Sequence, residues 1–204
     1  MSQTTLDEND LDVLSNVQVT VEDVSYVIFT SGSTGRPKAV SVLNRNIVSH
    51  ISSATMLNII NGDVIVIQIG PCSFDVHIQE ILASIVAGST IAMLHPGGNF
   101  DIKLIWKVIN SQRVTCETLT TEMVAKLMAY LSSDCKVYHG YGPSECTLAA
   151  AYHLIVFQDL HSSSIPIGRP MPNYQCYVLD EYLQLVGINQ LGELYIGGAG
   201  VFSG

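Results

Sequence analysis

The chain has 204 residues, of which 48% are apolar and only 13% are charged, and its formal net charge is −9. This length is enough for one domain with a sizeable core, or for one large domain with an appendage. Nine Lys and Arg residues cannot form a wide phosphate-contacting surface, and no apolar run approaches the ~20 residues that span a bilayer. The polar, acidic start is not a signal peptide, and five cysteines without a C-x-x-C pair predict reduced, mostly buried thiols. We therefore expect a cytoplasmic protein with no membrane or nucleic-acid partner.

The first elements in chain order are two strands and a helix. Residues 1–22 are acidic and are predicted to be loose. Val24–Phe29 is predicted as a buried strand and Ala39–Leu43 as a second strand. Asn44–Leu57 fits a helix, and one of its sides carries Ile47, Val48, Ile51 and Ala54.

The middle of the chain continues with alternating strands and helices. We predict strands within 63–70, 89–94 and 114–119, helices within 72–88 and 101–110, and a loop at 96–99. Gly88 is a plausible C-cap of the first of these helices. Its apolar face has helical spacing and consists of Ile78, Ile81, Leu82, Ile85 and Val86. A further helix, capped by Thr120 or Thr121, has a predicted core face of Met123, Val124, Leu127, Met128 and Leu131.

This alternation over about 120 residues predicts an α/β fold with a parallel sheet. After Pro166 the pattern changes to short strands, within 175–186 and 192–198, separated by turn residues. We expect a small antiparallel β unit at this C-terminal end. The predicted division is a loose segment at 1–22, a central α/β part at 23–164 and a β-rich part at 165–204.

A loop rich in hydroxyls and glycines follows the first strand. It holds Thr30, Ser31, Gly32, Ser33, Thr34 and Gly35, and it closes on Lys38. Glycines allow backbone N–H groups to converge on an anion, hydroxyls donate to phosphate oxygens, and the lysine adds positive charge. The loop is not a Walker A motif, because Pro37 stands where that motif needs glycine. Taken alone, the loop is either a polyphosphate site or a flexible turn between two strands.

Five motifs in order resolve this choice through a resemblance to a known family. "TSGSTGRPKAV" (Thr30–Val40) resembles the phosphate loop of the adenylate-forming superfamily. "SFDVHIQE" and "GYGPSECT" resemble the F-D-x-S-x-x-E and N-x-Y-G-P-T-E motifs of nonribosomal peptide synthetase adenylation domains, and "IPIGRPMPN" with "YVLDEYLQLV", then "GELYIGGAGV", resemble the segments that follow. The chain therefore resembles the central part of the large N-terminal domain of such enzymes, from about Val24 to its last residue.

The resemblance implies ATP-dependent activation of an amino acid. The product is an aminoacyl adenylate, and the acyl group then passes to the phosphopantetheine thiol of a carrier domain. ATP and Mg²⁺ are the implied cofactors, and the amino acid and the carrier domain are the implied partners. In such chemistry the protein mainly positions the acid and stabilises charge on phosphorus.

Mapped onto this chain, the resemblance assigns the nucleotide site. The loop Thr30–Lys38 would hold the β- and γ-phosphates, and Tyr141 would stack on adenine between Gly140 and Gly142. Ser144, in place of the usual threonine, would face the α-phosphate, and Glu145 would ligate Mg²⁺. Lys38, Ser144 and Glu145 are the implied catalytic residues.

The resemblance also assigns the amino-acid site. Asp75 would pair with the α-ammonium, and the residues implied to line the side-chain pocket are Val76, Gln79, Thr118, Gly140, Leu148 and Ala149. These positions favour a medium-sized or polar side chain. In isolation Asp75 could be only an N-cap, Glu145 a solvated charge and Tyr141 a core aromatic residue.

Several departures from the family pattern are visible. The chain begins just before the phosphate loop and ends at "VFSG", so we expect it to lack an N-terminal part, a ribose-binding Asp and a C-terminal domain with a catalytic lysine. About twenty residues that include a Gly-Gly-Glu strand are absent before "VYHGYGPSE", which should leave backbone groups unpaired or shift the sheet register. His139 and His77 replace Asn and Ser, and neither needs to be catalytic.

Three functions remain open from the sequence. The first is amino-acid activation, incomplete in this chain. The second is a remnant that binds nucleotide weakly and catalyses nothing. The third is an acyl-CoA or aryl-acid ligase, against which Asp75 argues, because a fatty acid has no ammonium group to pair with it.

Overall fold

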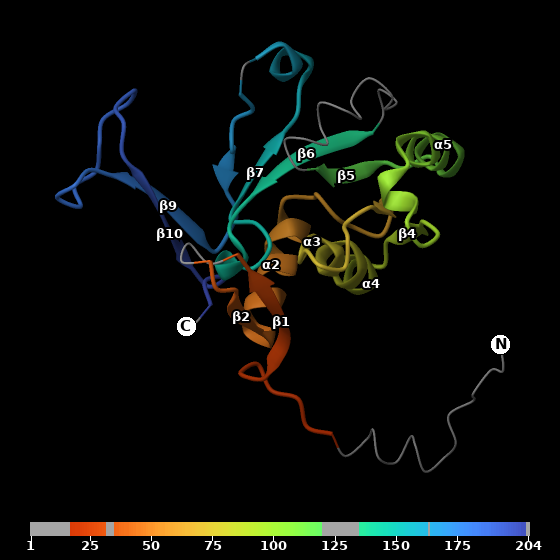
Figure 1. Ribbon diagram of the computed structural model, residues 1–204, viewed down its shortest axis with the longest axis horizontal. Helices are drawn as coiled ribbons and strands as arrows, with labels where there is room; N and C mark the ends of the chain where they lie inside the picture. Colours follow the sequence, from red (N-terminus) through yellow and green to blue (C-terminus); the bar gives the residue numbers. More distant parts are fainter. Residues whose placement is uncertain (1–16, 32–34, 120–134, 163, 203–204) are drawn as a thin grey trace.

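The computed structural model describes residues 17–31, 35–119, 135–162 and 164–202 (Figure 1). A mixed six-stranded sheet lies at its centre, and two separate antiparallel strand pairs lie beside it. This arrangement confirms the predicted α/β class with a small antiparallel unit near the C-terminal end. The helix predicted after Thr120 or Thr121 lies outside the described residues, as does most of the predicted loose segment.

The phosphate-loop motif begins in an antiparallel hairpin. Strand β1 (Val24–Thr30) pairs with β2 (Lys38–Leu43), and α2 (Asn44–Met56) follows directly. The prediction of a buried first strand is wrong, because Val24, Val27 and Phe29 are exposed on one face of the pair. Two strands alone have no second layer over that face.

The central sheet has the order β4-β3-β5-β6-β7-β8. Strands β3 (Ile65–Gln68), β4 (Thr90–Met93), β5 (Cys116–Leu119) and β6 (Lys136–Tyr141) pair in parallel, as the helix–strand alternation predicted. Strands β7 (Ala151–Leu154) and β8 (Arg169–Pro170) extend the sheet in antiparallel fashion.

The sheet is continuous at the point where the sequence is short. Strand β5 pairs directly with β6 over four residues, from Cys116 opposite Lys136 to Leu119 opposite His139. We expected the missing strand to leave backbone groups unpaired or to shift the sheet register. Unpaired backbone between β5 and β6 does not arise.

The helix after β3 differs from its predicted orientation. It consists of α3 (Val76–Ile78), a π-helical turn η1 (Gln79–Ala83) and α4 (Ser84–Ala87), and Gly88 ends it with φ 72°, as the predicted C-cap requires. Its buried face holds Gln79, Glu80, Ala83 and Ser84, whereas Leu82, Ile85 and Val86 of the predicted core face are exposed. The prediction was wrong for these three residues because Gln79 and Glu80, on the opposite face, find hydrogen-bond partners inside the protein.

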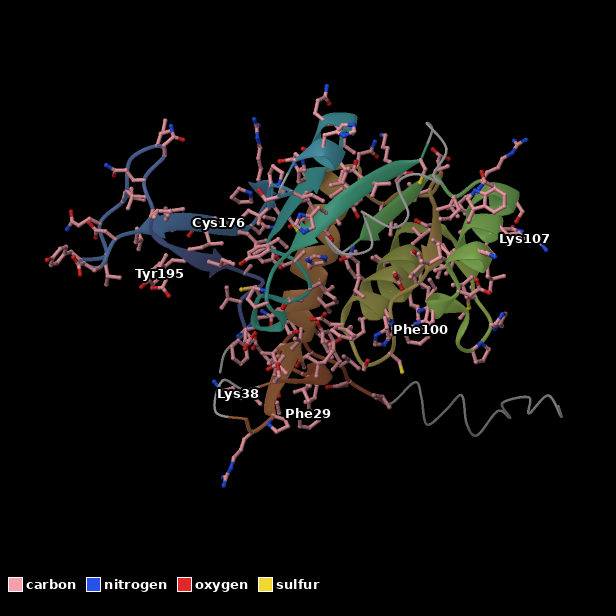
Figure 2. The ribbon with its side chains drawn as sticks, turned by 45° about the horizontal axis from the view of Figure 1, so that its top comes forward. Phe29, Lys38, Phe100, Lys107, Cys176 and Tyr195 are labelled. Carbon is pink, nitrogen blue, oxygen red and sulfur yellow. The ribbon has the colours of Figure 1, made fainter. Side chains whose placement is uncertain are left out.

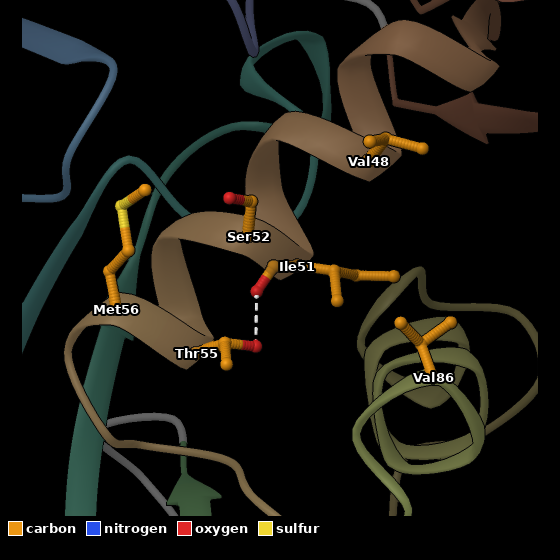
Figure 3. A pocket seen from close by; sticks show the side chains of 6 residues that line it. All are labelled: Val48, Ile51, Ser52, Thr55, Met56 and Val86. Atoms are coloured by element: carbon orange, nitrogen blue, oxygen red, sulfur yellow. Dashed lines mark hydrogen bonds between the residues drawn. The ribbon is translucent and has the colours of Figure 1, made fainter.

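An apolar groove results on the outside of the molecule. It lies between α2 and α4 and is lined by Val48, Ile51, Ser52, Thr55, Met56 and Val86 (Figure 3). Val48 was predicted on the core side of α2, but it is 60% exposed. Ile47, Ile51 and Ala54, the other three residues of that prediction, are buried.

The remaining helix packs against β3 in a second core cluster. A 3₁₀ turn, η2 (Gly98–Phe100), occupies the predicted loop and leads into α5 (Ile102–Gln112). Asp101 caps α5 by accepting hydrogen bonds from the backbone N–H groups of Lys103 and Leu104. Ile105 and Ile109 of α5 share one core cluster with residues of β3 and β6.

The C-terminal segment contributes to the other core cluster. After the 3₁₀ turns η4 (Ser144–Cys146) and η5 (Phe157–His161), β9 (Tyr174–Leu179) and β10 (Glu193–Gly198) form an antiparallel pair that extends away from the sheet (Figure 1). Met171 and Tyr174 are buried in a cluster with Ile47 and Ile51 of α2. The site described below is built around this cluster.

The cysteine prediction holds only in part. Cys72, Cys135, Cys146 and Cys176 are free thiols. Of these four only Cys146 is buried, so the expectation of mostly buried thiols is wrong for the residues that the structure describes.

Candidate functional site

The phosphate-loop motif connects β1 to β2 at the end of the hairpin. Thr30 and Lys38 stand opposite each other in the strand register, so the loop returns to its starting point. Gly35 has φ 78°, a conformation that glycine adopts without strain. Lys38 is exposed at this end of the hairpin (Figure 2), while Gly32, Ser33 and Thr34 lie outside the described residues.

The motif "GYGPSECT" reaches the same region from the end of β6. Gly140 and Tyr141 end β6, and Ser144 and Glu145 lie in η4. Strand β2 packs against η4, so the strand that begins with Lys38 and the turn that holds Ser144 are brought together although over 100 residues separate them. Tyr141 is 39% exposed, which leaves its ring accessible to a planar ligand.

Gly142 is required by the turn that joins the two motif halves. A Cβ atom there would lie 2.7 Å from the backbone nitrogen of Ala150 and 2.9 Å from the Cα of Ala149. Because neither backbone atom can move independently of the sheet, the close approach depends on glycine.

Asp75 is the most informative of the predicted site residues. It stands at the N-terminus of α3, yet it makes no side-chain capping hydrogen bond. Its Oδ2 atom is buried and has no hydrogen-bond partner within the described structure. Burial raises the pKa of this carboxyl above its ordinary value, and a hydrogen bond from the Ser144 side chain opposes the shift. A buried carboxylate oxygen without a hydrogen-bond partner fits an ammonium group that arrives with a ligand.

Tyr26 adds a second unsatisfied polar atom close to Asp75. Its hydroxyl is buried and has no hydrogen-bond partner among the described residues. Burial, and then the charge of Asp75, raise the pKa of Tyr26. The sequence analysis missed this residue, because a tyrosine inside an alternating strand pattern resembles any other core aromatic.

The other predicted pocket residues lie on three neighbouring segments. Val76 and Gln79 are on the helix that Asp75 begins, and Leu148 and Ala149 are buried just after η4. Thr118 is on β5, where its backbone is in register with Tyr138 of β6. Leu148 and Ala149 share a core cluster with Ile78 and Ala83 of that helix, whereas the side chain of Thr118 is not described.

Gln79 takes part in a buried polar network that the sequence did not reveal. Its Oε1 accepts a hydrogen bond from the Tyr152 hydroxyl at 2.7 Å and lies 3.1 Å from Nε2 of His50. Tyr174 approaches the other ring nitrogen of His50 at 3.5 Å. Burial lowers the pKa of His50 to about 4, and hydrogen bonds to Gln79 and to the Ala149 backbone oppose this shift. The imidazole is therefore neutral at physiological pH.

Glu80 fixes the loop that leads to Asp75. Its carboxylate accepts hydrogen bonds from the backbone N–H groups of Ile69 and Gly70, at the carboxyl end of β3. Burial raises the pKa of Glu80 to about 7, while these hydrogen bonds act in the opposite direction. A Cβ atom on Gly70 would lie 2.6 Å from Cγ1 of Val76, so loop and helix are in tight contact here.

Glu145 suits a magnesium site that includes phosphate oxygens. Its residue is half-buried in η4, and its backbone carbonyl accepts a hydrogen bond from Phe202 at 2.8 Å. The described residues contain no group of three or more His, Cys, Asp or Glu side chains that could hold a metal. A single carboxylate is the usual protein contribution where Mg²⁺ is bound together with substrate phosphates.

The two unusual histidines have local partners. His139 is buried on β6, and its Nδ1 lies 3.0 Å from the carbonyl oxygen of Pro166. Nδ1 of His77 contacts the carbonyl oxygen of Phe74. Neither histidine needs a catalytic role to explain its position.

Comparison with known proteins identifies relatives over almost the whole chain. Residues 2–134 and 129–204 match the sequence profile of the family described as "AMP-binding enzyme". Bacitracin synthase 2 of Bacillus licheniformis is 31% identical over 89% of this chain, and malpinin synthetase of Mortierella alpina is 29% identical over 89%. These alignments cover only 8% and 3% of the two relatives.

Solved structures share the fold. The N-terminal subdomain of Klebsiella oxytoca NpsA, in complex with 3-hydroxyanthranilyl-AMSN, has a TM-score of 0.75 at 23% identity and matches 96% of this chain. PA1221, a protein containing adenylation and PCP domains, has a TM-score of 0.76 at 23% identity and matches 92%. The chain spans 57% and 43% of these two structures. No helix among the described residues is long and apolar enough to cross a membrane.

Proposed function

This chain belongs to the AMP-binding enzyme family, and we propose that it is the central part of an adenylation domain that activates an amino acid with ATP. The single observation that carries the amino-acid assignment is Asp75. Its buried carboxylate oxygen has no partner and lies at the start of a helix, close to Ser144. Isolating such a group costs free energy that a substrate ammonium group would recover.

The proposed reaction is attack of the substrate carboxylate on the α-phosphorus of ATP. One carboxylate oxygen forms the new P–O bond, and the bond to the β-phosphate oxygen breaks, so that aminoacyl adenylate and pyrophosphate are the products. The acid is itself the nucleophile, so the protein needs to orient it and to stabilise negative charge on the phosphates. Asp75 orients the amino acid through its ammonium group.

The nucleotide is assigned to the two motifs that meet at η4. The loop from Thr30 to Lys38 donates hydrogen bonds and positive charge to the β- and γ-phosphates, and Tyr141 stacks on the adenine. Ser144 donates to the α-phosphate. Glu145 would hold Mg²⁺, and that ion would supply positive charge to the phosphate oxygens.

The wider context follows from the relatives. Adenylation and PCP domains occur together in PA1221, and we propose that a phosphopantetheine-bearing carrier domain receives the acyl group here as well. We also propose a cytoplasmic location and a division into a central α/β part, 23–164, and a β-rich part, 165–204.

The chain covers only part of its solved relatives, and this limits the activity that we expect of it. Because it covers about half of each solved relative, we expect the 204-residue polypeptide alone to adenylate weakly or not at all. Loss of one preorganised charge donor of the kind this reaction needs typically slows chemistry by roughly 10²–10³.

The test begins with the full-length transcript across this locus. Its product and the 204-residue chain are then assayed for amino-acid-dependent ATP–pyrophosphate exchange. Exchange by the longer product but not by the chain would support amino-acid activation by the whole. Exchange with aryl or fatty acids only would favour a ligase of another class, and nucleotide binding without any exchange would favour a remnant.

A further inference from the structure

We propose that His50 and Tyr152 are positioning residues that set the amino-acid selectivity of this site by holding Gln79 and the Leu148–Ala149 segment in place. The inference rests on the proposed function, because it concerns the pocket beside Asp75. Neither residue belongs to one of the motifs, and neither lies next to a predicted pocket residue in the sequence. His50 lies on α2 and Tyr152 on β7, and both side chains contact Gln79.

Two hydrogen-bond donors fix the orientation of the Gln79 side chain. The amide oxygen has two lone pairs, and two donors approach it, the Tyr152 hydroxyl at 2.7 Å and Nε2 of His50 at 3.1 Å. A neutral imidazole has one N–H, and since an amide oxygen only accepts, this proton is on Nε2. The oxygen of Gln79 therefore points into the protein and cannot serve as an acceptor for a substrate side chain.

The segment that follows η4 has an uncommon backbone conformation. Thr147 and Leu148 have φ values of 55° and 72°, which are uncommon for residues with a side chain. Such a conformation persists only where surrounding contacts determine it. Here the Thr147 hydroxyl donates to the carbonyl oxygen of Gly200 at 2.6 Å, and the Tyr174 hydroxyl lies 3.0 Å from the carbonyl oxygen of Cys146.

His50 connects Gln79 to the segment that follows η4. Its Nε2 contacts Gln79, and its second ring nitrogen lies 3.5 Å from the hydroxyl of Tyr174, which bonds to the carbonyl oxygens of Cys146 and Thr147 just before Leu148. The Tyr174 and His50 rings pack edge to face with centroids 6.4 Å apart. His50 is fully buried, so water does not compete for these contacts.

The π-helical turn explains why Gln79 can face this network. Turns of this kind widen a helix by one residue and occur often at functional sites. Gln79 is the first residue of the turn η1, and it is 8% exposed. The residue thus lies between the pocket side of the helix and the His50–Tyr152 pair.

We therefore expect substitutions in this network to change recognition of the amino-acid side chain and to leave nucleotide binding unchanged. Replacing His50 by Leu removes the donor to Gln79 and the contact with the Tyr174 hydroxyl at similar volume. Replacing Tyr152 by Phe removes a single hydroxyl and is the milder variant if the first does not fold. Replacing His50 by Gln keeps a side-chain donor and should restore part of the selectivity.

The control is Ser53, which is also fully buried on α2. Its hydroxyl bonds to the carbonyl oxygens of Ser49 and Pro172 and not to the network. Ser53→Ala should lower thermal stability without altering which amino acid is preferred.

The experiment measures binding by the full-length product with 5′-O-sulfamoyladenosine and a panel of its aminoacyl derivatives in a calorimeter. We expect the wild type to prefer one aminoacyl derivative over sulfamoyladenosine by at least about tenfold. In His50→Leu this preference should fall about tenfold, and in Tyr152→Phe about threefold, with sulfamoyladenosine affinity unchanged. The loss should be partly reversed in His50→Gln.

Three results would count against the inference in different ways. A wild type that binds sulfamoyladenosine but prefers no aminoacyl derivative would remove the proposed amino-acid function and this inference with it. A wild type with a clear preference that His50→Leu and Tyr152→Phe leave intact would overturn the inference alone. Equal losses for sulfamoyladenosine and its derivatives would show that the network is only structural.

Discussion

Replacing Asp75 by Asn should stabilise the protein while removing its affinity for amino acids. The Asp75 carboxylate is largely buried, and one of its oxygens has no hydrogen-bond partner. Among the groups that shift its pKa, His77 is the one basic side chain. An unsatisfied buried polar group costs roughly 1–3 kcal/mol. Asn keeps a polar atom at this place but carries no charge, and the residue remains partly exposed, so we expect a gain at the lower end, about 1 kcal/mol. For a protein of this size, 1 kcal/mol corresponds to about 2–4 °C in Tm.

The pH dependence of stability provides a second test of Asp75→Asn. A carboxyl whose pKa is raised on folding binds its proton more tightly in the folded protein than in the unfolded chain. Wild-type stability from this group therefore increases as the pH falls through the folded pKa, and the gain is complete below the ordinary value near 4. Because Asn has no such titration, the advantage of the variant should shrink between pH 7 and pH 4.

The assay is thermal unfolding followed by circular dichroism at pH 7 and at pH 4 to 5. Asp101→Ala is a matched control, because Asp101 also stands at a helix N-terminus but does cap it, with bonds to Lys103 and Leu104. Losing that cap should cost about 1 kcal/mol. If Asp75→Asn also lowered Tm at pH 7, Asp75 would be a structural residue and our argument for a vacant ammonium partner would fail.

Further predictions concern the phosphate loop, the close approach at Gly142 and the buried Glu80. Lys38→Ala should weaken ATP binding in a calorimeter by about tenfold, whereas Lys107→Ala, on the exposed face of α5, should leave it unchanged. Gly142→Ala should lower the free energy of unfolding by about 1–3 kcal/mol in a urea titration, because its Cβ would lie 2.7 Å from the Ala150 nitrogen. Burial raises the pKa of Glu80 to about 7, so wild-type stability should decrease as the pH rises from about 4 to 7, and Glu80→Gln should remove that slope.

Much of the fold followed from local patterns. Period-two and period-3.6 spacing located most of the described strands and helices, and the Gly88 C-cap is a short-range feature that a sequence displays directly. Strands β6, β7 and β8 were not predicted. The pairing of β1 with β2 as a separate antiparallel hairpin did not follow, because strand direction depends on partners and not on the strand's own residues. The exposure of Phe29 and Val27 has the same origin.

The candidate site was predictable in its motifs but not in its supporting residues. The resemblance supplied Asp75, Ser144 and Lys38. The packing of β2 on η4 brings the segments of Lys38 and Ser144 together, and Ser144 bonds to Asp75. Tyr26 and His50 were missed because their significance lies in neighbours that are distant along the chain. His50 and Gln79, for example, are 29 residues apart.

The largest error, the orientation of the helix after β3, has a physical explanation that bears on function. Burying Gln79 and Glu80 in place of Ile85 and Val86 forgoes hydrophobic stabilisation, and it is tolerated only because each polar group is bonded inside. Local rules of foldability are broken mainly where a site needs them broken. A helix that buries its polar face beside an unpaired carboxylate is therefore better explained by ligand recognition than by stability, and the opposite signs expected for Asp75→Asn and Asp101→Ala follow from that reasoning.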